Sequence, residues 1–442
     1  MRFSIDLKKQ KMPLPELAVC FYFVLYFILP SMEAGSGVVP FLVGFVYTLF
    51  LMWKEPDWRK PVLWFWGLAV AFAAMYLWLT NTFTIAEDLA NRDLRRLFSK
   101  TFQVFTMYFP ALLAVRVCRR ATRRQQGFLL LAAVATYGYV IFVTVRALIE
   151  NPNISHSWQM TDELVEDVII SDPNVGRFYF ICAMPILISL AVDLAICTKK
   201  RYMRLLWIAV AFGLVCFIVM SQYTLALLIA FLGIIVEIFR HLTTNNSRLL
   251  MAGIVIVAAL FLPDVLGWIA SWIPAEDVSI RFREIADFFL FGTEPGYNLG
   301  TRMSLYSETL GAFLDSPLYG NHQLDFNGHS TLLTVLSDTG MLGGIPFYGL
   351  IVLFFRRTNR LVGETRIRLW PMFVQWLLVG LFNPFQFAPP LSFAVWFVVP
   401  VATVLFEGRR DPGSESVLAE ADTKRKISTM PKRKELADEP TV

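Results

Sequence analysis

The sequence predicts an all-α polytopic membrane protein, and three observations support this fold class. Of the 442 residues, 56% are hydrophobic, and the chain contains 39 Phe and 12 Trp. Only 17% of the residues are charged, whereas soluble globular proteins contain roughly 25%. Apolar runs of about 20 residues, the length that a helix needs to cross a bilayer, recur along most of the chain.

Taken in order, the apolar runs predict about twelve transmembrane helices. They cover residues 15–31, 35–53, 62–82, 101–117, 127–147, 177–197, 205–220, 223–239, 249–273, 331–355, 369–383 and 389–406. Lys8, Lys9 and Lys11 precede the first run, as they would in a signal peptide. No small-residue cleavage site follows, so we expect a first helix that is retained.

Most connecting segments alternate in their content of Lys and Arg. The exceptions are 83–100, which carries Arg92, Arg95, Arg96 and Lys100, and 274–330, which carries three Arg. The basic segments are KEPDWRK (54–60), RVCRRATRRQQ (116–126), TKKRYMR (198–204), RHLTTNNSR (240–248) and RRTNRLVGETRIR (356–368). The segments with neither Lys nor Arg are 32–34, 148–176, 221–222 and 384–388. By the positive-inside rule, this alternation predicts that both termini are cytoplasmic.

The predicted organisation is one membrane domain between two ends. Residues 1–14 are the cytoplasmic N-terminus, and residues 15–406 are the transmembrane domain, whose sizeable outer loops are 148–176 and 274–330. Residues 407–442 are charged and contain Pro and Ser, which is typical of a disordered tail, here on the cytoplasmic side. The cysteines, at 20, 118, 182, 197 and 216, lie in apolar runs or at their ends, so no disulfide framework or thiolate metal cluster is expected.

Few ionisable residues fall inside the predicted helices. Asp193 and Glu237 lie near predicted cytoplasmic ends, and Asp264 lies in the outer half of its helix. Ion-coupled transporters use a central cluster of such residues, and none is expected here. The membrane helices are therefore interpreted as a scaffold, and the chemistry is expected in the outer loops.

The outer loop 274–330 contains two predicted short helices. In the first, Phe282, Ile285, Ala286 and Phe289 recur at helical spacing, which predicts an amphipathic helix along the outer membrane surface. Its Arg281 and Arg283 are placed to meet lipid phosphates; alternatively, Arg283 pairs with Asp287 on a solvated face. The second helix is predicted to start near Thr301 and to end before Pro317.

Charged and titratable residues gather around that second helix. Arg302 lies in its predicted first turn, where a cation opposes the helix dipole, so a purely structural role is disfavoured. His322 and His329, two of only four His in the chain, follow on the loop before the helix predicted at 331–355. One alternative to a functional role is that His329 is an ordinary residue of the loop or of the helix start. A metal site of His322, Asp325 and His329 is another, but the Asn327–Gly328 pair interrupts any helix that would align them.

Several motifs resemble the O-antigen ligase and Wzy-type polysaccharide polymerase family. The motif carrying the resemblance most directly is His329-Ser330-x-x-Leu333-x-x-Leu336-x-x-x-Gly340-x-x-Gly343. Arg302 followed by a helix and Pro317-Leu318-x-Gly320 is also similar, as is Asp172-Pro173-Asn174 before a middle helix. Where many members carry a Ser-Arg pair, this chain has Ser221-Gln222. Another cation must substitute there, and Arg177, Arg281 and Arg283 are the candidates.

The resemblance implies a GT-C-like fold and a metal-independent, inverting glycosyltransferase without a cofactor. The donor would be an oligosaccharide on undecaprenyl diphosphate, and the acceptor a sugar hydroxyl on another lipid-linked repeat unit, at the outer face of the bacterial cytoplasmic membrane. Arg302 would hold the diphosphate, and His329 would orient or deprotonate the acceptor hydroxyl. The implied substrate-binding set also includes Arg177, Arg281, Arg283, Asn174 and His322. Membrane lipids, a flippase and a chain-length regulator are expected partners, and nucleic acid is not.

Two other functions stay open. One is a ligase that moves finished glycan onto a lipid core or a protein, since no residue separates the two kinds of acceptor. The other is a flippase or exporter of the same lipid-linked sugars. About twelve helices fit an exporter, but the large outer loops and the lack of central membrane charge do not.

Overall fold

The computed structural model describes residues 11–33, 38–79, 90–151, 173–242, 260–272, 297–321, 330–362, 368–383 and 388–407, with a few isolated positions between them. These residues are almost all helical and contain no β-strand. Eight helices are long and apolar enough to cross a membrane, and three further apolar helices are shorter. The predicted all-α, membrane-type architecture is therefore confirmed, whereas the count of about twelve spans stays a prediction.

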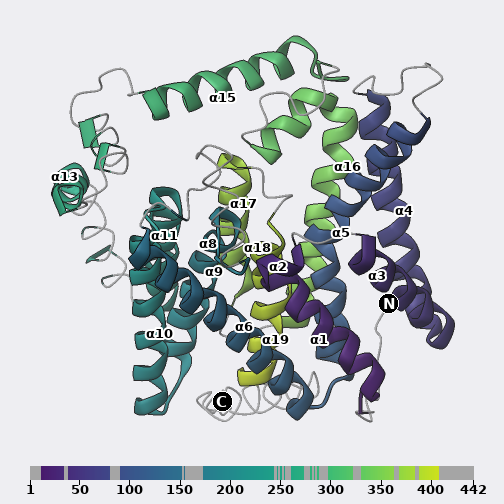
Figure 1. Cartoon of the computed structure of the whole chain (residues 1–442), viewed down its shortest axis with the longest axis horizontal. Helices are drawn as coiled ribbons and strands as arrows, with labels where there is room; N and C mark the ends of the chain where they lie inside the picture. Colours follow the sequence, from purple (N-terminus) through teal and green to yellow (C-terminus); the bar gives the residue numbers. More distant parts are fainter. Residues whose placement is uncertain are drawn as a thin grey trace, which may run out of the picture.

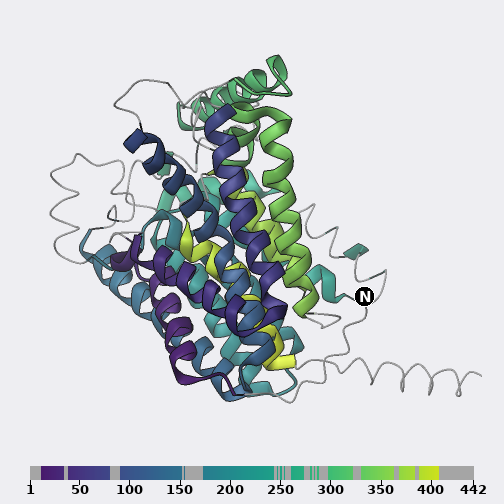
Figure 2. The same cartoon turned by 90° about the vertical axis from the view of Figure 1, so that its right-hand side faces the viewer.

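Figures 1 and 2 show the helices gathered into one bundle, with α15 lying across one end of it. In order along the chain, the first helices are α1 (Leu14–Ile28), α2 (Pro30–Glu33), α3 (Val38–Lys54), α4 (Pro56–Leu79), α5 (Ala90–Arg120) and α6 (Arg123–Glu150). They are followed by α8 (Phe178–Ile181), α9 (Met184–Cys197), α10 (Arg201–Met220), α11 (Thr224–His241) and α13 (Leu262–Trp272). The C-terminal part of the chain contains α15 (Tyr297–Asp315), α16 (Thr331–Val362), α17 (Leu369–Phe382), α18 (Pro389–Phe393), the π-helix η3 (Ala394–Val398) and α19 (Val399–Glu407).

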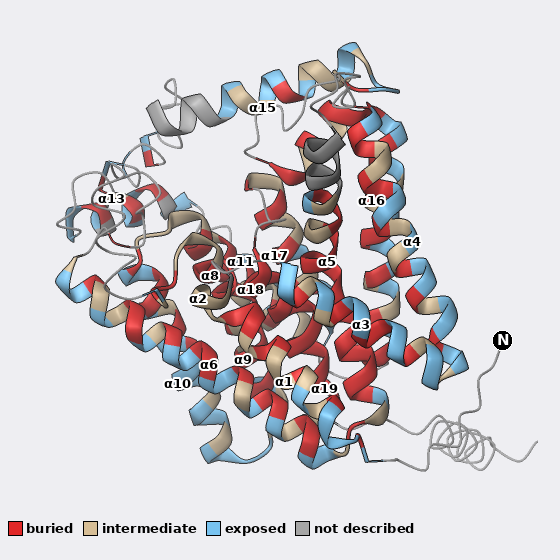
Figure 3. Ribbon diagram, turned by 45° about the vertical axis from the view of Figure 1, so that its right-hand side comes forward, coloured by how far each residue is buried: buried red, intermediate tan, exposed pale blue. Residues whose placement is uncertain are grey.

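The centre of the bundle is formed by α5 from Phe98 onward and by the α18–η3–α19 segment, whose residues are mostly buried (Figure 3), and half-buried α17 packs beside them. Large aromatic rings fill the space between them. Trp376 and Trp396 meet edge to face with their centroids 5.3 Å apart, and Tyr108 stacks on Phe354 at 4.7 Å. Because lipid tails are as apolar as these side chains, such close packing rather than hydrophobicity holds neighbouring helices together.

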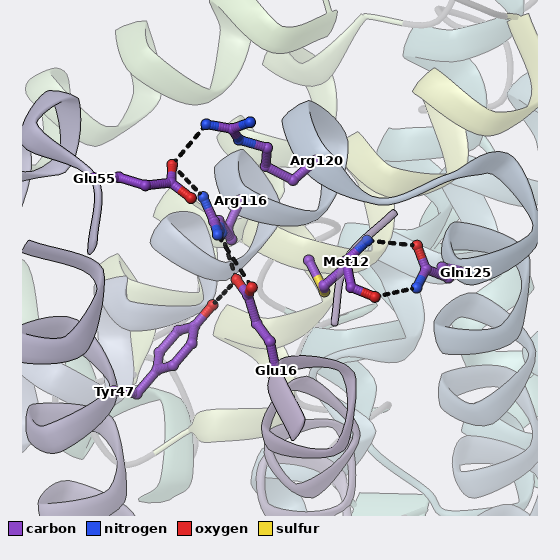
Figure 4. Close-up of polar contacts among 7 residues, drawn as sticks. All are labelled: Met12, Glu16, Tyr47, Glu55, Arg116, Arg120 and Gln125. Atoms are coloured by element: carbon purple, nitrogen blue, oxygen red, sulfur yellow. Dashed lines mark hydrogen bonds and ion pairs between the residues drawn. The ribbon is translucent and has the colours of Figure 1, made fainter. Parts of the chain in front are cut away.

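A buried ionic cluster joins α1, α3 and α5 at the end of the bundle that the loop charges predict to be cytoplasmic (Figure 4). The Arg116 guanidinium forms an ion pair with Glu16, and both side chains are almost fully buried. Arg116 also pairs with Glu55 at 2.7 Å, and Arg120 with the same Glu55 oxygen at 2.9 Å. The Tyr47 hydroxyl donates to Glu16 at 3.0 Å. Each carboxylate therefore has cationic or hydroxyl donors around it, which a buried charge requires.

Helix α6 begins at this same end with a capping box. The Thr122 side chain accepts a hydrogen bond from the Gln125 N–H at 3.3 Å, and the Gln125 side chain accepts from the Thr122 N–H at 3.0 Å. The Gln125 amide also donates to the Met12 carbonyl at 2.7 Å and accepts from the Met12 N–H at 3.2 Å. The start of α6 thus anchors the segment that leads into α1 (Figure 4).

Several predicted boundaries need correction. The segment 83–100, predicted as a loop, is helical from Ala90 onward and continues into α5. The helix predicted at 177–197 is divided into α8 and α9 just before Pro185. Of the span predicted at 249–273, the structure describes a continuous helix only over α13.

Helix α16 begins at Thr331, as predicted, and bends at Gly340, whose φ is +58°. The chain between α15 and α16 packs on this bend backbone to backbone: Met341 N–H donates to the Pro317 carbonyl at 2.8 Å, and Asn321 N–H to the Ser337 carbonyl at 2.7 Å. A Cβ on Gly340 would collide with the backbone of Leu318. Only glycine tolerates both this φ and so close a contact with another backbone segment. The bend at Gly340 therefore allows the segment around Leu318 to pack against α16.

Candidate functional site

The first turn of α16 is fixed by the residue that follows His329. Ser330 is the N-cap: its Oγ accepts from the Leu333 N–H at 3.2 Å, and its carbonyl accepts from the Thr334 N–H at 2.9 Å. The same Oγ donates to the Gly380 carbonyl at 3.3 Å. Thr331 N–H points to the Asn383 carbonyl at 3.5 Å. The start of α16 is therefore held against the C-terminal end of α17.

Helix α15 reaches the same end of α17. The Tyr306 hydroxyl donates to the Phe382 carbonyl at 3.1 Å. Arg302 lies four residues before Tyr306, hence one turn earlier on α15. The predicted second helix of the loop is confirmed, but it starts at Tyr297, so Arg302 lies in the second turn and not the first. The effect of the helix dipole falls off within the first turn, so the dipole no longer disfavours a structural role for Arg302.

The other predicted site residues are distributed more widely. His329, His322, Arg281 and Asp325 lie outside the described residues. Arg283 is exposed and helical, and only isolated residues around it are described.

Asn174 and Arg177 lie in the turn that precedes α8. Asn174 Oδ1 accepts from the Ser31 N–H at 3.4 Å, which ties this turn to α2. The Arg177 carbonyl accepts from the Phe180 and Ile181 N–H groups, and the next ring, Phe178, lies 5.2 Å from Tyr223. The backbone of Arg177 is therefore near the turn that contains Gln222. At this turn many members of the resembled family have an arginine, and Arg177 is one of the candidates to replace it.

A small cavity opens beside the first turns of α16, between α4, α5 and α16. Its volume is about 30 Å³, room for one or two water molecules. Tyr76, Lys100, Thr331 and Thr334 are among the residues that line it. Lys100, which the sequence placed in a loop, is only 8% exposed.

A polar chain runs from this cavity into the bundle. The Lys100 ammonium lies 4.3 Å from the centroid of the Tyr76 ring, and the Tyr76 hydroxyl donates to the carboxylate of Asp338. Asp338 is fully buried and also accepts from the Ser337 hydroxyl at 3.3 Å. Sequence reasoning missed Lys100, Tyr76 and Asp338. The available signal was an ionisable residue, Asp338, within a predicted membrane helix.

The polar side chains that line this cavity belong to Tyr76, Lys100, Gln103, Thr331 and Thr334, and its other lining residues are apolar. The amide nitrogen of Asn383 is buried and has no hydrogen-bond partner among the described residues. Since the N-terminus of a helix favours negative charge, this arrangement suits an anion.

A second charged cluster joins α9 and α11. Arg240 contacts Asp193 at 2.6 Å and Glu237 at 2.8 Å, and His241 Nε2 lies 2.6 Å from the same Asp193 oxygen. Both carboxylates are fully buried. Sequence reasoning treated Asp193 and Glu237 as separate charges near helix ends, but the fold joins them. The side chains of Asp193, His241 and Cys197 are close enough to share a metal ion. However, the Oδ1 atom of Asp193 is already in contact with Arg240 and His241.

No known protein family and no curated protein matches this chain.

Proposed function

We propose that the chain is a glycosyltransferase that polymerises lipid-linked oligosaccharide repeat units at the outer face of the bacterial cytoplasmic membrane. The product would be a surface polysaccharide such as O-antigen, capsule or exopolysaccharide. One observation carries the proposal: α15, which bears Arg302, and the start of α16, next to His329, both bond to residues 380–383. Glycosyl transfer needs a leaving diphosphate and an acceptor hydroxyl at one place, and these two anchors support such a place.

The chemistry assigned to the two residues follows from their side chains. Arg302 presents a fixed fork of donors that stabilises the charge growing on the leaving diphosphate. An unperturbed imidazole changes charge near neutral pH, so histidine suits the role of general base. In the proposed mechanism His329 accepts the proton of the acceptor hydroxyl, which attacks the anomeric carbon with inversion and displaces the diphosphate. General-base help of this kind contributes about 10²–10⁴-fold to the rate.

The proposed orientation puts α15 outside and the Arg116 cluster at the cytoplasmic end. The alternating basic segments support this orientation. Lipid-linked glycan would then meet Arg302 and His329 at the level of the outer headgroups.

The direct test supplies the purified full chain with lipid-linked repeat units alone. A ladder of lengthening products is expected, and both His329→Ala and Arg302→Ala should lose polymer at normal protein levels. Arg146→Ala is a matched control, because Arg146 is exposed and pairs only loosely with Glu150 at 3.6 Å. Retained polymer synthesis by both site variants would rule out the assignment.

Two rival functions make different predictions in the same assay. A ligase gives no product until a lipid core or protein acceptor is added. A flippase moves labelled lipid across a vesicle membrane without forming a glycosidic bond, and the buried Asp193–Glu237–Arg240–His241 cluster favours this second candidate. Transport that persists in the His329→Ala and Arg302→Ala variants, with no ladder from the unaltered chain, would establish it.

A further inference from the structure

We propose that four side chains at the contact between α9 and α11 form a zinc-binding site that links the two helices. They are Asp193 and Cys197 of α9, and Glu237 and His241 of α11. In each helix the two residues are four positions apart, so they lie on the same face, as do the two histidines of a zinc-binding His-Glu-x-x-His helix. The site goes beyond the proposed function and uses none of the residues assigned to glycan transfer.

The first argument is that three of the four side chains converge on one point. One ligand atom from each of Asp193, Cys197 and His241 lies within 4.8 Å of the others. His241 Nε2 is 2.6 Å from Asp193 Oδ1, and Cys197 Sγ is 3.8 Å from the same oxygen. Zinc binds such atoms at about 2.0–2.3 Å in a tetrahedron, which separates the ligand atoms by about 3–4 Å. Small side-chain shifts therefore bring all three onto one ion.

The second argument is the way Arg240 divides the two carboxylates. Its Nη2 contacts one oxygen of each, Asp193 Oδ1 at 2.6 Å and Glu237 Oε2 at 2.8 Å. The other two oxygens, Asp193 Oδ2 and Glu237 Oε1, are buried and have no hydrogen-bond partner among the described residues. Buried polar atoms are normally satisfied, so a metal ion is a fitting complement to the two oxygens that Arg240 leaves over.

The third argument is the position of the His241 ring. Its Nε2 lies 2.6 Å from Asp193 Oδ1 and 3.0 Å from Arg240 Nη2. An imidazole nitrogen either donates or accepts: with its proton it faces a second donor in Arg240, and without it a second acceptor in Asp193. A metal ion removes this conflict, because the unprotonated nitrogen binds the ion while Arg240 keeps the carboxylates in place.

The chemistry of the four ligands selects the metal. Thiolate and imidazole favour zinc, whereas magnesium and calcium prefer oxygen ligands alone. The thiol proton of Cys197 leaves for the solvent when the thiolate binds. Two carboxylates and one thiolate then carry three negative charges, which Zn²⁺ and the Arg240 guanidinium balance. Four protein ligands without an open position are typical of a structural zinc site.

The ends of the two helices give the ion a way in. The His241 side chain is 21% exposed, and Cys197 is half-buried, whereas both carboxylates are fully buried. Zinc can therefore enter past His241 and Cys197 and reach the carboxylates behind them.

The test titrates Zn²⁺ into the purified full chain in detergent, freed of metal with a chelator and carrying no polyhistidine tag. A single equivalent should bind tightly and raise the temperature of unfolding, because the ion binds the folded chain and joins α9 to α11. Cys197→Ala and His241→Ala should each weaken zinc binding by more than about 100-fold, since residues outside the ligand set alone change metal affinity by about 10–100-fold. Cys216→Ala is the matched control: Cys216 is exposed on α10, and this variant should bind zinc like the unaltered chain.

Cobalt gives a readout that reports the ligands themselves. Co²⁺ in the site should show the near-ultraviolet charge-transfer absorption of a cobalt–thiolate bond, which Cys197→Ala loses and Cys216→Ala keeps. Absence of this absorption from the unaltered chain would overturn the site, whether or not any variant folds. Binding of Mg²⁺ as tight as that of Zn²⁺ would also overturn it, because a general attraction of cations to buried acids would then explain the data.

This inference and the proposed function fail separately. Unchanged zinc binding by folded Cys197→Ala and His241→Ala variants removes the site, even if the chain polymerises glycan. Zinc bound through Cys197 by a chain that elongates no lipid-linked repeat unit leaves the site standing and removes the polymerase.

Discussion

At the residue scale, Arg116 illustrates how one buried charge holds several segments. It bonds to Glu16 of α1 and to Glu55 between α3 and α4, and its side chain is 3% exposed. We predict that Arg116→Ala lowers the free energy of unfolding by about 3–5 kcal/mol, because Glu16 is left as an unpaired buried charge. Thermal unfolding in detergent measures the effect. Arg146→Ala, at an exposed ion pair, should unfold like the unaltered chain, and an equal loss in both variants would contradict the argument.

Glu55 makes the same cluster sensitive to pH. Burial by itself raises the pKa of Glu55, but its hydrogen bonds and ion pairs with Arg116 and Arg120 outweigh burial and hold the pKa below the ordinary value of 4.5. A lowered pKa contributes stability above the unfolded-state pKa, and this contribution is lost as the pH falls through the folded-state pKa. We therefore predict that the unaltered chain is more stable than Glu55→Gln at pH 7 and that the difference shrinks below about pH 4.5. A difference that grows with acidification would contradict this sign.

At the scale of elements, the bend in α16 decides how the end of the connection from α15 is attached. Gly340 has φ +58° and Gly320 has φ +76°, and each lies against the backbone of the other's segment. We predict that Gly340→Ala costs at least about 1–2 kcal/mol from the left-handed backbone alone, with a further loss from the collision with Leu318. Polymer synthesis should fall as well, since this contact positions the loop that leads to His329.

Gly349→Ala is the control on the same helix. A Cβ on Gly349 meets no atom within 4 Å, and alanine is the better helix former by about 1 kcal/mol. This variant should unfold at the same temperature as the unaltered chain or slightly higher. If Gly340→Ala behaves like Gly349→Ala, the bend does not determine the packing of the loop.

At the scale of the whole molecule, the proposed function depends on which side of the membrane α15 faces. We predict that Asp315→Cys, at the exposed end of α15, reacts with a membrane-impermeant maleimide in intact cells. Lys200→Cys, between α9 and α10, should react only after lysis. Both substitutions are made in a chain whose five free cysteines are replaced. The reverse labelling pattern would place the proposed site in the cytoplasm, where assembled glycan is not expected.

Much of the architecture could be read from local sequence features. The start of α16 at Thr331 and the existence of α15 followed from an apolar run and from breaker residues around a helical segment. Helix boundaries were less accurate: α5 begins at Ala90, because a polar helix can extend beyond the membrane-spanning part that hydropathy detects. That error is why Lys100 was assigned to a loop.

The sequence by itself determined the all-helical membrane class, because the length of an apolar run is a local property and the bilayer imposes it. Only the tertiary structure decided which polar groups lie together. Tyr76 and Asp338 are 262 residues apart, and Asp193 and His241 are 48 apart, yet each pair is hydrogen-bonded. Such contacts depend on how helices pack, and no periodicity or spacing within one helix specifies its neighbours.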